Sequence, residues 1–385
     1  MARIDLPNVQ GLAAVIAALN GQVRLVGGVV RDTLAGVATK DIDLATPLAP
    51  EAVMAALKAA GLKAVPTGLA HGTVTAVAEG RPFEITTLRR DVATDGRHAK
   101  VAFTDDWRED AARRDFTINA LYADPVTGEV FDYFGGLADL EAGIVRFIGA
   151  PLQRIAEDHL RILRFFRFHA RFGSGGPDAA SLSACQTRAN DLMALSRERI
   201  AMELLALLAL PNPAPTLALM IESGIFVPVL PEIADAAPVT HLVTREAEAG
   251  IVPDALRRLC ALIAPDPVLA EDIANRLKLS NAQRKRMIAV AARAAEDASA
   301  PRALAYWQGV EVAIDRLLLG NGDPRPLMDW TPPRFPINGG AIVARGVQAG
   351  PEVARILQSA ERQWVAEGFP EAARAEAIVA ALIPA

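Results

Sequence analysis

Cysteine and histidine are scarce in this chain, and their scarcity excludes several kinds of site. The 385 residues include two cysteines, Cys185 and Cys260, and five histidines that lie far apart. Two cysteines cannot build a disulfide framework or a zinc site alone, so we expect buried thiols in a reducing compartment. No histidine is followed by aspartate, so the His-Asp pair of metal phosphohydrolases is absent and no histidine-based metal site is expected.

Long apolar runs and an excess of positive charge are also missing. No window of 18 residues is both apolar and uncharged, so no transmembrane helix is predicted. Segment 12–19 is apolar, but the flank before it carries Asp5 and a single basic residue, Arg3. We therefore expect an ordinary helix there and a cytoplasmic protein. Forty Lys and Arg against 45 Asp and Glu give a net charge of −5, so nucleic acid would have to bind local basic patches.

The pattern of residue types divides the chain into two parts. Residues 1–146 alternate short β-rich runs with helical runs, which indicates an α/β or α+β domain. Beyond that point alanine and leucine recur at helical spacing, with almost no strand signal. We predict a mixed first domain, a helical segment over 147–210 and a helical remainder over 211–385.

Local patterns predict the elements that would position functional residues. Pro50 before segment 51–60 and Gly61 after it are typical helix boundaries. The predicted elements are strands over 22–26 and 41–45, helices over 51–60, 111–122 and 151–172, and a hairpin with strands over 73–78 and 82–87.

A pair of glycines followed by an arginine predicts a phosphate-binding turn. Gly27 and Gly28 stand between a predicted strand and a predicted helix, where backbone N–H groups can approach a phosphate closely. Arg31, on the first helical turn, would add a fork of donors for the same anion.

Three carboxylates predict a reaction centre beside that turn. Asp41 and Asp43 lie two residues apart on a predicted strand, so both face one side. Adjacent carboxylates repel one another unless a cation lies between them, and oxygen ligands beside a phosphate favour Mg²⁺. Glu84 could bring a third carboxylate to the same edge. These residues predict metal-assisted phosphoryl or nucleotidyl transfer. The alternatives are a surface turn for the aspartates and a solvent-facing strand position for Glu84.

Several segments, taken in order, form a known pattern. GGVVRD at 27–32 is followed by DID at 41–43. Further segments are GLAHGTVT at 68–75, DGRH at 95–98, DAARRDFTINA at 110–120, EDHLR at 157–161, SRERIAMEL at 196–204 and a tail pattern over 351–364. Together they resemble the class II tRNA nucleotidyltransferase and poly(A) polymerase family. The resemblance implies a nucleotidyltransferase head followed by a helical neck, body and tail. It also places 95–98 in a mobile loop.

Segment 110–120 adds candidates for nucleotide binding. Arg113, Arg114 and Asp115 offer two guanidinium groups and a carboxylate, which suit triphosphate and ribose contacts. The resemblance adds Asn119 from the same segment. The alternative is a surface helix with ion pairs at a spacing of four.

The predicted helix over 151–172 carries candidates for base recognition. Asp158 and Arg161 would lie one turn apart on one face. Such a pair can accept from an exocyclic amine and donate to a ring nitrogen or carbonyl, and thus read adenine or cytosine. The resemblance assigns that role to both residues. The alternative is an ion pair within the helix. Glu157 is a candidate for orienting Arg161.

Basic residues continue along and beyond this helix. Arg164 and Arg167 follow at a spacing of three and would reach the triphosphate or the RNA end. The arginines of this mostly apolar stretch need anionic partners. Six basic residues and no acidic residue lie between 276 and 293. That segment could hold an RNA backbone through phosphate contacts, and a solvated helix face is the alternative.

The resemblance implies addition of CCA to the 3′ end of tRNA from CTP and ATP with Mg²⁺, and no DNA or membrane partner. A poly(A) polymerase, or an enzyme that adds only part of CCA, is the alternative within the same class. A third possibility is an inactive nucleotide- or RNA-binding protein. Intact Arg31, Asp41 and Asp43 argue against it.

Overall fold

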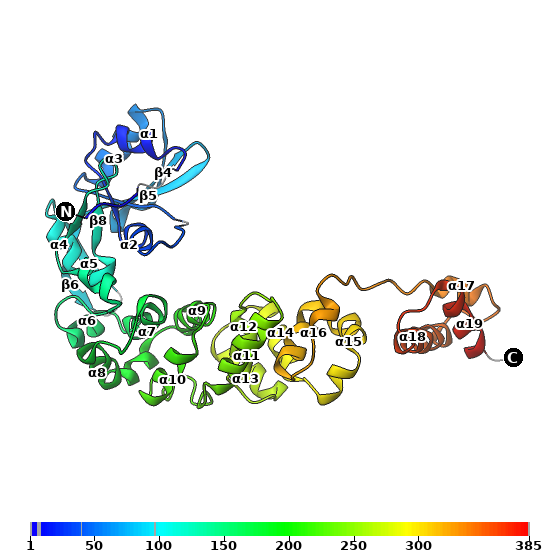
Figure 1. Cartoon of the computed structure of the whole chain (residues 1–385). Coiled ribbons are helices and arrows are strands. Elements are labelled where there is room, and N and C mark those ends of the chain that lie inside the picture. The colour runs from blue at the N-terminus through cyan, green and yellow to red at the C-terminus, as the bar shows by residue number, and fades with distance from the viewer. Residues whose placement is uncertain (1, 6–8, 40, 96–97, 384–385) are drawn as a thin grey trace. The chain divides into compact units, whose positions relative to one another are not determined.

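The computed structural model describes residues 2–5, 9–39, 41–95 and 98–383, and the chain divides into two compact units (Figure 1). Unit 1 comprises Met1–Leu207 and Pro215–Pro231, and unit 2 comprises Leu208–Ala214 and Glu232–Ala385. Gly96 and Arg97 of the segment expected to be a mobile loop lie outside the described residues. Among the described residues, no helix has the length and apolar character of a membrane span.

A seven-stranded sheet of order β3-β4-β5-β2-β1-β8-β9 forms the centre of unit 1. Its strands are β1 (Arg24–Val26), β2 (Asp43–Thr46), β3 (Lys63–Gly68), β4 (Thr73–Ala78), β5 (Arg81–Thr87), β8 (Leu121–Ala123) and β9 (Val130–Asp132). β2 and β5 are parallel, and the other neighbouring strands are antiparallel. A separate hairpin consists of β6 (Arg89–Asp95) and β7 (His98–Phe103).

Helices surround this sheet and continue along unit 1. They are α1 (Leu12–Ala18), α2 (Gly28–Leu34), α3 (Pro50–Ala59), α4 (Trp107–Ala112), α5 (Gly136–Ala142), α6 (Pro151–Glu157), α7 (Arg161–Phe172), α8 (Ala179–Thr187), α9 (Arg197–Leu208) and α10 (Ala214–Glu222). α1 and α3 cover one face of the sheet (Figure 1), where Val15 and Leu57 share an apolar cluster with Leu44 and Ile85.

The opposite face of the sheet is covered only in part. Val26, Ala45 and Tyr122 alternate along their strands with residues of the first cluster and form a second cluster. Trp107 and Ile148 pack against it. This second cluster lies over β1, β8 and the end of β2. The start of β2 and the neighbouring part of β5 therefore stay open to solvent.

Most predicted elements of unit 1 are confirmed, except the helices predicted over 111–122 and 151–172. The predicted hairpin is present, and its turn residues Glu79 and Gly80 both have positive φ, 50° and 77°, as a tight two-residue hairpin requires. The predicted helix over 111–122 is wrong. α4 ends at Ala112, and β8 follows because apolar residues there are buried on both faces of the sheet beside β1.

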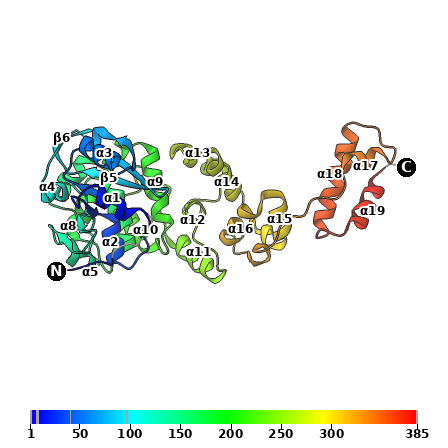
Figure 2. The same ribbon diagram turned by 90° about the horizontal axis from the view of Figure 1, so that it is seen from above.

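Unit 2 contains helices and no strand among its described residues, which confirms the predicted fold class. The helices are α11 (Ala237–Glu248), α12 (Ala255–Ala261), α13 (Pro267–Arg276), α14 (Asn281–Ala291), α15 (Pro301–Gln308), α16 (Val310–Leu319), α17 (Gly339–Val343), α18 (Pro351–Ala366) and α19 (Ala372–Leu382). α18 and α19 lie side by side (Figure 2) and share a core that includes Ile356 and Ile378. Cys185 and Cys260 are free and buried, as predicted.

A buried ionic network joins three helices of unit 2. Glu246 of α11 accepts from Arg257 at 2.7 Å and from Arg258 at 2.8 Å, and Arg257 also donates to Asp315 of α16 at 2.7 Å. Arg258 and Glu246 are only 1% and 2% exposed. Each charge in the network depends on its partners, because water cannot replace them.

Candidate active site

Three carboxylates lie near one another where β2 begins beside the middle of β5. The parallel register places Asp43 opposite Glu84. Asp41, Asp43 and Glu84 are exposed, whereas the alternating residues Ile42 and Ile85 are buried. The expected alternation is thus present, although β2 begins only at Asp43 and Asp41 precedes the strand.

These carboxylates line a hollow of about 460 Å³. Burial raises the pKa of Asp43, and the negative charge of Glu84 raises it further, while Arg114 opposes the shift. No described residue forms an ion pair with the three carboxylates. Like charges without a direct ion-pair partner are typical of a place that binds a cation.

The donor set fits Mg²⁺ held jointly with a substrate. Within the described ranges, no three His, Cys, Asp or Glu side chains converge into a complete metal site. Mg²⁺ commonly uses one or two carboxylates and takes its other ligands from water and substrate phosphates. Asp41 and Asp43 fit that pattern, and Glu84 does not complete a three-ligand cluster with them.

The paired glycines reach the same end of the sheet. β1 is antiparallel to β2, so Gly27, which follows β1, lies beside the start of β2. Its N–H donates to the carbonyl of Leu121 at 3.0 Å. Gly27 has a φ of 67°, and a Cβ there would stand 3.2 Å from Nη1 of Arg114. The backbone conformation therefore favours glycine, and a Cβ would also crowd the end of the Arg114 side chain.

Arg31 lies on the first turn of α2, as predicted, and is buried. Its Nε and Nη2 donate to Oδ1 of Asp32 at 2.8 and 2.6 Å, and its Nη1 donates to Asn119. Burial lowers the pKa of Arg31, and Asp32 partly offsets that effect. Two residues from separate motifs, Arg31 and Asn119, are thus in direct contact.

Arg113 and Arg114 follow the end of α4 and converge on the buried Asp110. The Asp110 carboxylate accepts three hydrogen bonds: from Arg113 Nε at 2.8 Å, from Arg114 Nη2 at 3.1 Å and from the Tyr122 hydroxyl at 2.6 Å. The alternative considered for these arginines, a surface helix with ion pairs at a spacing of four, is only partly formed: Arg114 pairs with Asp110 at that spacing, but Asp110 is buried and both arginines follow the end of α4. Both guanidinium groups keep further N–H donors for a nucleotide.

Asp110 provides a pH-dependent test of this cluster. Burial alone would raise the pKa of Asp110, but Arg114, Arg113 and Tyr122 lower it to about 2. The unfolded value is about 3.9, so the ionised carboxylate stabilises the fold above that pH, and its contribution is lost as the pH falls through about 2. Asp110→Asn should lower the free energy of unfolding at pH 7, and the gap to wild type should narrow by about 2 kcal/mol at pH 2.

Urea unfolding of both proteins between pH 7 and pH 2 measures that gap. The exposed Asp105→Asn is a matched control five residues earlier, and it should follow the wild type at every pH. A gap for Asp110→Asn that stays constant with pH would contradict the assignment.

The predicted single helix over 151–172 is wrong, so Asp158 and Arg161 do not share one helix face. α6 ends at Glu157, Asp158 is extended with φ −154° and ψ 107°, and α7 begins at Arg161. The Asp158 carboxylate accepts from the N–H of Leu160 at 3.1 Å. Such local bonds compete with a continuous helix and are typical of helix starts. An aspartate before an apolar run was the signal that could have revealed the break.

Separate partners hold Asp158 and Arg161. Arg199 of α9 donates to both carboxylate oxygens of Asp158, at 2.8 and 3.1 Å. Arg161 donates to Glu157 at 2.6 Å. The alternative of a direct Asp158–Arg161 ion pair is therefore not formed. Glu157 orients Arg161, as expected, and segment 196–204 supports Asp158.

All four arginines of α7 have carboxylate partners, which confirms the prediction that they need anions. The pairs are Arg161 with Glu157, Arg164 with Asp115, Arg167 with Glu203, and Arg171 with Asp32. Asp115 also accepts from Asn119 at 2.9 Å. Burial would raise the pKa of Asp115, but Arg164 and Asn119 lower it overall. One network therefore runs from Arg31 through Asn119 and Asp115 to Arg164.

Sequence reasoning did not single out Asp32 and Arg171. Asp32 binds Arg31 through Oδ1 and Arg171 through Oδ2, the latter at 2.9 Å, and so links α2 to α7. An acid directly after a buried arginine was a usable signal for Asp32. Arg171 offered none, because its partner is 139 residues away.

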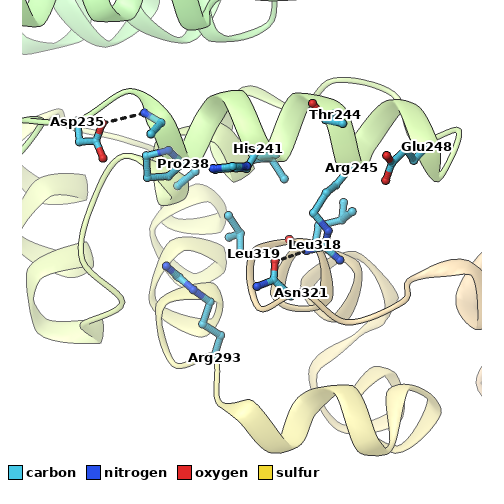
Figure 3. Close-up of a pocket in the computed structure, with 13 residues that line it drawn as sticks. Asp235, Pro238, His241, Thr244, Arg245, Glu248, Arg293, Leu318, Leu319 and Asn321 are labelled. Carbon is cyan, nitrogen blue, oxygen red and sulfur yellow. Dashed lines mark hydrogen bonds between the residues drawn. The ribbon is translucent and has the colours of Figure 1, made fainter.

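Unit 2 has a cavity of its own, of about 680 Å³, which no predicted site residue lines. Figure 3 shows Arg245 extending from α11 towards the end of α16. Its guanidinium donates to the carbonyl of Gly322 at 2.5 Å and of Leu317 at 3.3 Å, and to the Asn321 side chain at 3.3 Å. Such bonds satisfy carbonyls at a helix C-terminus and so stabilise the fold.

The basic segment 276–293 lies on α13 and α14 and carries less free charge than its sequence indicates. Carboxylates from other parts of unit 2 pair with several of its arginines. The pairs include Arg276 with Glu232, Arg284 with Glu271, and Arg286 with Asp254 and Asp315. RNA binding by this segment stays a prediction.

Comparisons with known proteins agree with the geometry. Residues 23–146 match the family model of the poly A polymerase head domain, and residues 177–237 match the model described as the probable RNA and SrmB-binding site of polymerase A. The chain is 35% identical over 382 residues to CCA tRNA nucleotidyltransferase 1, mitochondrial, of Mus musculus. This match covers 94% of the chain and 86% of that protein.

Bacterial proteins give a similar result. The CCA-adding enzyme of Anoxybacillus flavithermus is 38% identical over 211 residues, which cover 54% of this chain and 51% of that enzyme. The Bacillus stearothermophilus CCA-adding enzyme, solved in complex with CTP, superposes with a TM-score of 0.75 at 27% identity and 92% coverage of both chains. The chain therefore belongs to the CCA tRNA nucleotidyltransferase and poly(A) polymerase family.

Proposed function

We propose that this protein adds C, C and A in turn to the 3′ end of tRNA, with CTP and ATP as substrates. The observation that carries the proposal is the meeting of Asp41 and Asp43 with the Gly27 turn and the Arg31–Asn119 contact at one end of a sheet. Similarity to a CCA tRNA nucleotidyltransferase over 94% of the chain supports the choice of reaction.

The nucleotide binds on the β1 side of the carboxylates. The backbone at Gly28 and the guanidinium groups of Arg31 and Arg114 face the triphosphate. Arg113, Arg164 and Arg167 add positive charge around it, and Asp115 and Asn119 contact the ribose. These side chains are held in place before the nucleotide arrives by the ion pairs described above, so little ordering remains at binding.

Asp41 and Asp43 would hold Mg²⁺. When bound, this ion neutralises charge at the α-phosphate and lowers the pKa of the attacking RNA 3′-hydroxyl. The two carboxylates face an open hollow, so an RNA end and a nucleotide have access to them at once. Glu84 is a candidate third catalytic carboxylate, on the side of the RNA acceptor.

Asp158 and Arg161 select the base. Arg199 fixes the Asp158 carboxylate as an acceptor for an exocyclic amine, and Glu157 orients the Arg161 donors. Cytosine and adenine both present an amine beside a ring nitrogen, whereas uracil and guanine present a carbonyl there. A fixed acceptor and donor thus favour CTP and ATP.

Arg199→Ala should reduce the preference for CTP and ATP over UTP and GTP about tenfold, because Asp158 loses the group that orients it. Single-nucleotide incorporation with each of the four triphosphates measures the preference. Arg197→Ala, two residues earlier on α9, is the control and should retain wild-type selection. Equal selectivity in Arg199→Ala and wild type would contradict this role.

Primer extension tests the proposed function. Purified protein and Mg²⁺ are given CTP, ATP or both with tRNA transcripts that end before CCA, after C and after CC. Addition that stops at CCA is expected, and an unstructured oligoribonucleotide should not be extended. Addition of A alone would indicate a partial adder, and long tails on both RNAs would indicate a poly(A) polymerase.

The cytoplasmic location stays a prediction, since the mouse relative is named mitochondrial.

A further inference from the structure

The carboxylate of Asp32 binds two arginines through different oxygens. Oδ1 accepts from both Nε and Nη2 of Arg31, at 2.8 and 2.6 Å. Oδ2 accepts from Nη2 of Arg171 at 2.9 Å. A carboxylate and a guanidinium commonly form two parallel hydrogen bonds that use both oxygens. In this structure Arg171 occupies Oδ2, so both donors of Arg31 converge on Oδ1.

This arrangement fixes the direction of the Arg31 guanidinium. Its Nη1 donates to the side chain of Asn119, and a Cβ on Gly28 would lie 3.8 Å from its Nη2. The guanidinium therefore lies between Asn119 and the glycine turn. If Oδ2 of Asp32 were free, Arg31 could turn to use both oxygens, and that rotation would draw Nη1 away from Asn119.

The last turn of α7 also holds Arg31 through aromatic rings. The guanidinium carbon of Arg31 lies 4.4 Å from the ring centroid of Phe172 and 5.0 Å from that of Phe168. A guanidinium at such a distance is attracted to the face of the ring. Phe168, Arg171 and Phe172 share one face of α7, because they are spaced by three and four residues. One helix face thus supplies both the partner of Asp32 and the rings against Arg31.

Two positive charges share the single carboxylate of Asp32. The side chain of Arg31 is only 7% exposed. Burial is the main cause that lowers the pKa of Arg31; Asp32 opposes this shift, and the positive charge of Arg171 lowers the pKa further. Positive charge held in excess beside a glycine turn at the start of a helix suits a phosphate group.

We propose that Arg171 is a positioning residue for nucleotide binding, which occupies Oδ2 of Asp32 and thereby keeps the Arg31 guanidinium directed at the triphosphate. This inference rests on the proposed function, in which Arg31 contacts the triphosphate. Arg161 at the start of α7 faces the base, and Arg171 near its end acts on the phosphates through Asp32. CTP and ATP carry the same triphosphate, so loss of Arg171 should weaken the binding of both equally.

The test compares Arg171→Ala with Arg188→Ala in the full-length protein. Arg188 follows α8 and pairs with Asp191, and its side chain is 37% exposed against 31% for Arg171. Arg171→Ala should raise the Kd and the KM for CTP and for ATP about tenfold, with the KM for tRNA unchanged. Arg188→Ala should bind both nucleotides as wild type does. Isothermal titration calorimetry gives the Kd values, and single-nucleotide addition gives the KM values.

Restoring a cation at Asp32 separates a positioning role from a structural one. Arg171→Lys retains a cation that can donate to Oδ2 and should recover most of the nucleotide affinity. Arg171 also lines a hollow of about 690 Å³ in unit 1, so a small cation has access to its place. Methylguanidinium chloride at millimolar concentration should therefore lower the Kd of Arg171→Ala for CTP and ATP, whereas the same concentration of sodium chloride should not.

Two results would overturn the role of Arg171. One is a Kd for CTP and ATP that is equal in Arg171→Ala and Arg188→Ala, since a lower melting temperature alone would leave Arg171 only a structural role. The other is a weakened Arg171→Ala that neither the lysine variant nor methylguanidinium improves. A wild-type protein that binds CTP and ATP without extending tRNA would contradict the proposed function, and the nucleotide affinities would still decide the role of Arg171.

Discussion

Asp43→Ala should reduce kcat for nucleotide addition about 10³-fold while the protein stays folded. A metal ion at a reacting phosphate stabilises the transition state by several kcal/mol, and about 4 kcal/mol corresponds to a 10³-fold change in rate. Asp43 is exposed and has no ion-pair partner among the described residues, so its loss breaks no fold-stabilising contact. Single-turnover extension of tRNA ending in CC with saturating ATP measures the rate.

Two further variants make this result specific. Glu51→Ala removes another exposed carboxylate of unit 1, on α3, and should extend tRNA at the wild-type rate. Asp41→Ala should match Asp43→Ala, because both carboxylates are needed to hold one ion. A loss of less than tenfold in Asp43→Ala, at unchanged stability, would show that Asp43 does not act in the reaction.

Glu246→Ala should lower the free energy of unfolding by about 3–5 kcal/mol, the cost of leaving a buried charge without its partner. Glu246 is the carboxylate partner of Arg258, whose other bonds go to backbone carbonyls of Leu208, Leu210 and Pro211. Arg258 is 1% exposed, so water cannot solvate its charge after the substitution. Differential scanning calorimetry should show one transition lowered by about 6 to 20 °C.

Glu248→Ala is the matched control, since Glu248 lies on the same helix and is exposed. It removes the same charge and should leave that transition where it is in wild type. Equal stability of Glu246→Ala and Glu248→Ala would mean that the buried network contributes nothing to the fold.

Local sequence patterns were sufficient for the carboxylate edge of the site. Asp41, Asp43 and Glu84 alternate with buried apolar neighbours, and a strand has only two faces. The glycine turn could also be predicted from the sequence, because glycine is the residue type that readily adopts the positive φ found at Gly27. In both cases the physical constraint acts within a few residues along the chain.

The surroundings of Asp158 and Arg161, the residues proposed for base recognition, could be predicted only in part. The sequence placed both residues on one helix, where their spacing would have made them partners. The structure breaks the helix at Asp158 and gives each residue a different partner, Arg199 and Glu157. Helix periodicity cannot show this, since the Arg199–Asp158 pair joins segments 41 residues apart.

The local charge of segment 276–293 could likewise not be predicted from the sequence alone. A count along the sequence adds neighbours in the chain, whereas the electrostatic potential depends on neighbours in space. Arg286 is surrounded by Asp254, Glu311 and Asp315, none of which lies in the segment. Acidic residues on neighbouring helices therefore neutralise part of the positive charge of this segment.

The sequence by itself determined the mixed head and helical remainder, the family and the alternation that brings Asp41, Asp43 and Glu84 to one edge of the sheet, because alternation, helical spacing and motif order are properties of neighbouring residues. Only the tertiary structure decided which carboxylate holds which arginine and that Arg31 contacts Asn119. A buried charge takes its partner from whichever element packs against it, and that choice depends on the strand order and not on distance along the chain.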